Sequence, residues 1–254
     1  MIPSILDQSL CMFPGISPEA EVEFRRMGVV SARQFAQSAD RYLSRKKAER
    51  VREFWHRWEK ALSLELVDMQ LSAFPCGHRV RALFDLWRKA VFLDIETDGT
   101  TGNPLVTCIT TLRDGDLKTF VRGRNLNDFL DVWKQALEGL VVSFNGKRFD
   151  VPMLQREFAL STLPPHVDLM DEAAHFGLRG GLKSIENIIG IVRPESDCRD
   201  GQDAVDFWQK YAATQSEEVL QTLISYNRYD VLALPILANV VLKKSLENTC
   251  IVHA

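Results

Sequence analysis

The first third of the chain repeats apolar residues at the spacing of packed helices. Between residues 41 and 64 they return every three or four positions, which places them on one face of a helix. Trp55 and Trp58 lie on that face, so we interpret them as core residues rather than as platforms for stacking bases. A stretch with proline and glycine over residues 73–85 predicts a linker. Residues 1–85 are thus expected to form a helical region.

A pair of shorter helices is predicted before this segment. Ser17 followed by Pro18 is typical of a helix start, and Gly28 ends that helix. Ser31 then begins a second helix. Helix, short turn and helix outline a helix-hairpin-helix element, whose turn amides can hold a nucleic-acid phosphate. Plain helical packing explains the same pattern, so both interpretations stay open.

After residue 86 the pattern changes to short apolar runs that predict strands. Residues 90–95 are apolar until one carboxylate interrupts them, which is typical of a strand buried on both faces. Asp114-Gly115 between two β-rich runs is a strong hairpin signal. The predicted order is strands 90–95, 104–113 and 117–122, helix 126–137, strand 140–144, helix 151–158, strand 166–170, and helices from 182 onward. This order predicts an α/β fold over residues 86–254, with a mixed five-stranded sheet flanked by helices.

Composition and cysteine usage limit the class of protein. A hydrophobic content of 46% with 26% charged residues is that of a globular chain rather than a disordered one. The five cysteines are scattered without a CxxC pair, which favours reduced thiols in a cytoplasmic protein. Cys76 and His78 lie close together, but two candidate ligands without a second pair predict a loop without metal. No secretory signal and no membrane span is expected.

The distribution of charge is uneven. The net charge is −3, yet residues 41–60 hold eight cations against three acids, a net +5 on an otherwise acidic chain. Such a basic segment suits an element that follows phosphates. A solvated helix face is the alternative for the same residues.

Two acidic residues interrupt the first predicted strand. Asp94 and Glu96 stand at positions i and i+2, so their side chains project from the same face. Two carboxylates on a buried face are costly unless a cation compensates them. Oxygen ligands without nearby cysteine favour Mg²⁺ or Mn²⁺ over Zn²⁺. Taken alone, such a pair is also common at a turn after a strand.

Three further residues complete the candidate site. Asp150 follows a predicted strand and the turn Asn145-Gly146, where it could cap a helix, present a ligand, or do both. Tyr226 and Asp230 are four residues apart on a predicted helix and so share one face. A tyrosine one turn before an aspartate suits a pair that holds a metal and a water together. Core packing is the alternative for Tyr226.

Three segments occur in the order of known exonuclease motifs: FLDIET at 92–97, FNGKRFDVPML at 144–154 and YNRYDVLAL at 226–234. With them the chain resembles the DnaQ-like superfamily of the ribonuclease H fold. No histidine lies five residues before Asp230, which resembles the tyrosine subtype (DEDDy). The chain is more closely similar to the YprB-like ribonuclease H-like branch, through HVDLM at 166–170, GLKSIENIIGI at 181–191 and DGQDAVDFWQKY at 200–211.

The resemblance implies a metal-dependent 3′→5′ exonuclease. Asp94, Glu96, Asp150 and Asp230 would bind two Mg²⁺ or Mn²⁺ ions, and Tyr226 would orient or deprotonate the attacking water. The implied substrate is a single-stranded 3′ end of DNA or RNA. The resemblance makes no prediction about protein partners.

Residues beside the metals are expected to contact the substrate, namely Thr97, Asn145, Lys147 and Lys183. For the two lysines a solvated surface position is the alternative. Asp168 is expected to have a structural role. Two other functions remain open on the same fold: a non-catalytic nucleic-acid-binding module and a structure-selective endonuclease.

Overall fold

The computed structural model describes residues 9–63, 67–194 and 200–247. The chain divides into two compact units. One contains the described residues of Met1–Trp87, Glu172–Gly177 and Asn239–Ala254, and the other contains those of Arg88–Asp171 and Leu178–Ala238. The first crossing between the units follows Trp87, close to the predicted end of the helical region.

The described part of the first unit is helical. Its elements up to Trp87 are α2 (Pro18–Arg26), α3 (Ala32–Gln37), η1 (Ala39–Arg41), α4 (Arg45–Ser63), α5 (Val67–Ala73), η2 (Arg79–Ala82) and α6 (Leu83–Leu86). The Ser17 side chain accepts the N–H of Ala20, and that of Ser31 accepts the N–H of Gln34. Both predicted helix starts are therefore confirmed, since each serine satisfies an amide of the first turn.

Aromatic side chains form much of the core of this unit. Trp55 and Trp58 are buried on α4, which confirms their prediction as core residues. Phe13 packs against α3 and α4, with its ring centroid 6.2 Å from that of Trp55 and 5.5 Å from that of Phe35. The helical spacing of the apolar positions thus gives the buried face that it predicts.

The cations of the basic segment lie mostly on the exposed face of α4. Arg45 pairs with Glu49 at 3.2 Å, and Arg52 pairs with Asp40 at 2.6 Å. Part of the segment's charge is therefore compensated by neighbouring acids, as on an ordinary solvated helix.

The predicted linker over residues 73–85 is wrong. This segment forms η2 and most of α6, and its Arg81 is fully buried. The Arg81 guanidinium pairs with buried Glu21 at 3.2 Å and donates to the Oγ of Ser245 at 2.8 Å. Proline and glycine do bend the chain here. The bent segment is nevertheless buried, because the charge of Arg81 is compensated by Glu21.

The second unit is built on a five-stranded sheet. Its strands are β1 (Ala90–Thr97), β2 (Val106–Arg113), β3 (Asp116–Val121), β4 (Leu140–Ser143) and β5 (His166–Asp168). The order is β3-β2-β1-β4-β5, with β1–β2 and β2–β3 antiparallel and β1–β4 and β4–β5 parallel. The predicted mixed five-stranded sheet is therefore confirmed.

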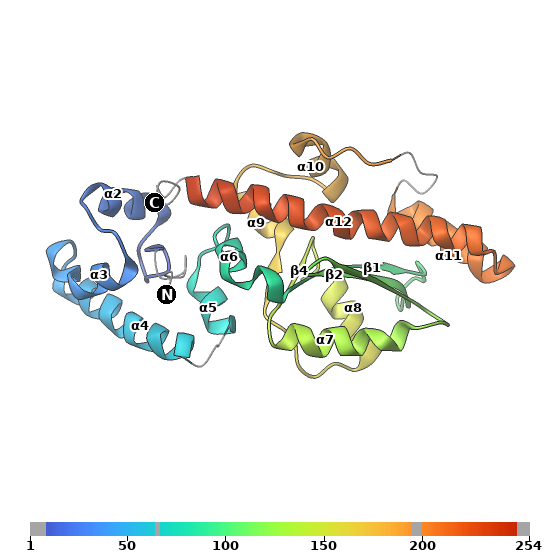
Figure 1. The fold of residues 1–254 in the computed structure, drawn as a ribbon, viewed down its shortest axis with the longest axis horizontal. Coiled ribbons are helices and arrows are strands. Elements are labelled where there is room, and N and C mark those ends of the chain that lie inside the picture. The colour runs from blue at the N-terminus through green and yellow to red at the C-terminus, as the bar shows by residue number, and fades with distance from the viewer. Residues whose placement is uncertain (1–8, 64–66, 195–199, 248–254) are drawn as a thin grey trace. The chain divides into compact units, whose positions relative to one another are not determined.

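Helices cover both faces of this sheet (Figure 1). The helices from residue 87 onward are η3 (Trp87–Lys89), η4 (Leu126–Asp128), α7 (Phe129–Leu137), α8 (Asp150–Phe158), α9 (Leu169–His175), α10 (Leu182–Ile189), α11 (Gly201–Thr214) and α12 (Glu217–Glu247). On one face α7 and α8 pack on apolar side chains of β1, and on the other α11 and the first half of α12 pack on β2. Within the described residues, we find no helix with the length and apolarity needed to cross a bilayer.

Candidate metal centre

Asp94 and Glu96 lie on the face of β1 that is opposite to α7 and α8. Their neighbours Leu93 and Ile95 pack into the apolar cluster under those two helices. Glu96 pairs across the sheet with Cys108, which belongs to the cluster under α11 and α12. Because side chains alternate along a strand, both carboxylates reach the face that α12 covers.

Helix α12 brings a third carboxylate to this face. The ligand atoms of Asp94, Glu96 and Asp230 all lie within 4.8 Å of one another. Asn227, one helical turn before Asp230, donates from its Nδ2 to the Oδ2 of Asp94 at 2.7 Å. Glu96 and Asp230 are only 8% and 7% exposed, so both carboxylates are largely removed from solvent.

Asp150 approaches the same strand from α8. It is the first residue of that helix, and the capping position belongs to Phe149, so of the two alternatives for Asp150 the helix cap is wrong. Its Oδ1 instead accepts the backbone N–H of Ile95 at 3.2 Å. Asp150 is buried, but it does not belong to the group of three carboxylates that lie within 4.8 Å of one another.

Burial and mutual repulsion make these acids difficult to ionise. Burial raises the pKa of Asp94 and of Glu96 well above the usual range, and the charge of Asp230 raises both further. Burial also raises the pKa of Asp150 to about 7. The pKa of Asp230 is raised by burial as well, although the Arg193 guanidinium opposes that shift.

This donor set fits a hard divalent cation. All the candidate ligand atoms are carboxylate oxygens, the type that Mg²⁺ and Mn²⁺ prefer. A cation among them would offset both the burial of the charges and their repulsion. The residues present are therefore suited to hold one.

Arg193 is a part of the site that sequence reasoning missed. Its Nη2 donates to the Oδ1 of Asp230 at 2.5 Å, and its Nε donates to Glu186 at 2.6 Å. Glu186 is buried, with 2% of its surface exposed. A buried acid on α10 needs a partner cation, but the sequence does not show that Glu186 is buried, so no local signal pointed to Arg193.

A cavity of about 270 Å³ opens beside the carboxylates, with Asp94, Asp230, Tyr226 and Lys183 among its lining residues. The Nζ of Lys183 lies 4.2 Å from the centroid of the Tyr226 ring, a cation–π contact. The tyrosine and a positive charge therefore line the same cavity as two of the acids.

The other predicted contact residues lie at or beyond the margin of this cavity. Asp168 accepts the backbone N–H groups of Asn145 and Lys147 at 2.8 and 3.0 Å, which confirms its structural role. The Lys147 ammonium lies 3.4 Å from Asp171. Within the described residues, neither Asn145, Lys147 nor buried Thr97 is among the residues that line the cavity.

Comparison with known proteins gives one family match. The sequence profile of the RNase H superfamily matches residues 91–242. Curated proteins give no significant match. Among solved structures, the family B DNA polymerase of the hyperthermophilic archaeon Pyrobaculum calidifontis is similar, with a TM-score of 0.49 and 18% identity over 60% of this chain. This chain covers only 24% of the polymerase. The Aedes aegypti Nibbler EXO domain has a TM-score of 0.44 and 16% identity, covering 68% of this chain and 86% of that domain.

Proposed function

This chain belongs to the RNase H superfamily, and from that premise we propose that it is a metal-dependent nuclease, specifically a 3′→5′ exonuclease of DNA or RNA. The observation that carries the proposal is the approach of Asp94, Glu96 and Asp230 to within 4.8 Å. Two buried acids and a partly buried one, so close together, destabilise a protein unless a cation joins them, so a role in structure alone does not explain them.

The four carboxylates would together bind two Mg²⁺ or Mn²⁺ ions. Asp94, Glu96 and Asp230 supply the close group, and Asp150 is proposed as the fourth ligand through the oxygen that does not accept the Ile95 amide. Bound divalent ions would supply Lewis acidity and lower the pKa of the attacking water. Asn227 holds Asp94 in place through its 2.7 Å hydrogen bond.

Tyr226 and Lys183 are proposed to act on the water and the phosphate. Tyr226 is 7% exposed and lines the cavity next to Asp94 and Asp230, where its hydroxyl can orient a water toward a phosphate. Lys183 lies over the same ring and contributes positive charge where a phosphate would enter. Thr97, Asn145 and Lys147 remain predicted substrate contacts, as the YprB-like assignment remains a predicted branch.

The decisive experiment compares 5′-labelled single-stranded DNA and RNA of identical sequence in Mn²⁺. An exonuclease that starts at the 3′ end gives a ladder that shortens from that end and releases mononucleotides. Asp94→Ala abolishes the products and leaves nucleic-acid binding largely intact, while Glu218→Ala, an exposed acid on α12, is the matched control.

Two outcomes would replace the proposal with its alternatives. Cleavage of a circular single strand, which has no end, would indicate an endonuclease. Binding of both nucleic acids without any Mn²⁺-dependent product would indicate a non-catalytic binding module.

A further inference from the structure

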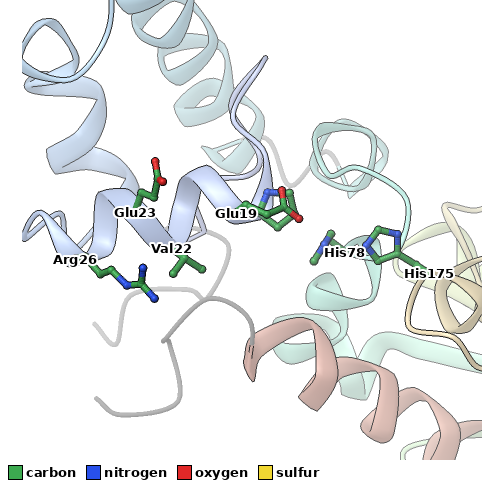
Figure 2. A pocket seen from close by; sticks show the side chains of 7 residues that line it. Glu19, Val22, Glu23, Arg26, His78 and His175 are labelled. Carbon is green, nitrogen blue, oxygen red and sulfur yellow. The ribbon is translucent and has the colours of Figure 1, made fainter.

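A second group of metal-ligating side chains lies in the first unit, around a cavity of about 450 Å³. Helix α2 contributes Glu19 and Glu23, the residue before η2 is His78, and the last residue of α9 is His175. Figure 2 shows the side chains of Glu19, His78 and His175 turned toward one another across this cavity. Among the described residues, none of those that line this cavity belongs to the candidate metal centre.

His78 is held in the orientation of a ligand. Its side chain is buried, at 1% exposure, and its Nδ1 lies 2.8 Å from the Oγ of Ser245. Its Nε2 is buried without a hydrogen-bond partner among the described residues. A buried ring nitrogen in this state destabilises the fold unless a ligand satisfies it. A histidine that binds metal through one ring nitrogen commonly has the other fixed by a hydrogen bond, as here.

His175 is placed beside His78 by the chain that packs under it. The two ring centroids are 5.2 Å apart, with 69° between the ring planes. A Cβ added at Gly77 would lie 2.3 Å from the Cγ of His175, so only glycine leaves room for this ring. The φ of Gly77 is +86°, which also favours glycine.

The charges around the cavity favour a cation. Glu19 and Glu23 line it with Arg26, so its acids outnumber its permanent cation. Metals bind the neutral imidazole, through whichever ring nitrogen carries no proton.

We propose that His78, His175 and Glu19 form a second metal site, which binds a transition-metal ion of the Zn²⁺ type rather than Mg²⁺. Two imidazoles and one carboxylate are a zinc-binding set, and they leave one position for water. The ligand atoms of His78, His175 and Glu19 do not all lie within 4.8 Å of one another, as those of the candidate metal centre do. Glu19 and His175 are exposed, so the proposed site requires that their side chains turn toward the Nε2 of His78 when the ion binds.

This site could not be predicted from the sequence, because its second histidine lies far from the first along the chain. Cys76 and His78 alone predict a loop without metal, and nothing in the spacing joins His78 to His175. The fold supplies the missing partner. The proposal does not rest on the nuclease function, because the two centres differ in both residues and ligand chemistry.

The test uses the full chain in an Asp94→Asn, Glu96→Gln background, which weakens the carboxylate centre. Titration calorimetry with Zn²⁺ is expected to give one tight site, and Co²⁺ is expected to give the visible absorption of a four-coordinate nitrogen and oxygen site. His175→Ala and Glu19→Gln each weaken Zn²⁺ binding by about 10-fold or more. Both positions are exposed, so these variants should fold, whereas His78 is buried.

His56→Ala removes an exposed histidine of α4 and is the matched control, with binding unchanged. Gly77→Ala, which displaces the His175 ring, should weaken binding as His175→Ala does. Zn²⁺ binding that survives both His175→Ala and Glu19→Gln, or no tight binding in the starting protein, overturns the proposal. Nuclease activity measured on the otherwise native chain in Mn²⁺ should be unchanged by His175→Ala, which keeps the two proposals separable.

Discussion

Asp150 accepts the backbone N–H of Ile95, the residue between Asp94 and Glu96, at a distance of 3.2 Å. This contact fixes the start of α8 against the strand that carries the first two acids. It occupies one oxygen of the Asp150 carboxylate and leaves the other for a cation. The hydrogen bond thus places the Asp150 side chain beside β1, although Asp150 lies 55 positions from Ile95 in the chain.

Two substitutions distinguish the two roles of Asp150, the hydrogen bond to the Ile95 amide and the proposed binding of a metal ion. Asp150→Asn keeps an oxygen for the Ile95 amide but loses the charge, so turnover should fall by about 100-fold with little loss of stability. Asp150→Ala loses the hydrogen bond as well, and an unsatisfied buried N–H costs about 1–3 kcal/mol. Mn²⁺-dependent turnover and urea unfolding measure the two effects. Wild-type turnover in Asp150→Asn would remove this residue from the ligand set.

The stability of the metal-free protein should respond to pH through Asp150. Burial raises its pKa from 3.8 to about 7, so the folded state binds a proton more tightly than the unfolded state. The contribution of Asp150 to the free energy of unfolding is present in full below pH 4 and is lost as pH rises through about 7. Over that range the free energy of unfolding falls by at most about 1.4 kcal/mol per pH unit. Unfolding in EDTA should show a shallower decline for Asp150→Asn than for the wild type. Equal slopes would contradict the assignment.

Tyr226 should matter for turnover rather than for metal binding. Tyr226→Phe keeps the ring under Lys183 and removes only the hydroxyl, so turnover should fall by about 100-fold. The increase in melting temperature caused by Mn²⁺ should stay the same, because no carboxylate changes. Tyr229→Phe, three residues further along α12, is the control and should keep its activity. Full activity in Tyr226→Phe would leave this tyrosine as a core residue.

Much of the fold could be predicted from local pattern. The apolar run of β1, the hairpin at Asp114-Gly115 and the helical spacing of α4 each depend on residues close together in the chain. The position of Glu96 on the same face as Asp94 follows from strand alternation alone. Which later helix meets Asp94 and Glu96 does not follow from local pattern. The motif at residues 226–234 indicated that it is the helix that carries Asp230.

Contacts made only by tertiary packing could not be predicted. Arg81 is buried because Glu21 lies opposite it, and the local sequence of residues 73–85 is that of an ordinary loop. Arg193 follows α10 without any periodic pattern, so its contact with Asp230 emerges only when α10 and α12 are in place. Asn227 was visible one turn before Asp230, but its target, Asp94, is on another element.

Asn227 should therefore be tested as a positioning residue. Asn227→Ala removes the 2.7 Å hydrogen bond to Asp94, and loss of such a bond weakens metal binding by about 10–100-fold. Mn²⁺ affinity by calorimetry measures this directly, with exposed Asn187→Ala on α10 as the control. Unchanged affinity in folded Asn227→Ala would show that the strand alone orients Asp94.

Arg193 and a bound metal ion should compete for the charge of Asp230. In the metal-free protein the guanidinium lies 2.5 Å from Asp230 and offsets a buried charge, so Arg193→Ala should unfold more easily in EDTA. A divalent ion takes over that compensation when it binds. The variant should then lose less stability in Mn²⁺ than in EDTA, and linkage requires that Mn²⁺ stabilise Arg193→Ala more than the wild type.

The comparison is a double cycle of four unfolding curves, with and without Mn²⁺ for both proteins. Arg148→Ala is the matched control, because Arg148 pairs with Asp171 at 3.1 Å and its removal should act equally in both conditions. A coupling of the opposite sign, with Mn²⁺ stabilising Arg193→Ala less than the wild type, would mean that Arg193 orients Asp230 for the metal. The sign of the coupling thus decides whether Arg193 substitutes for the cation or supports it.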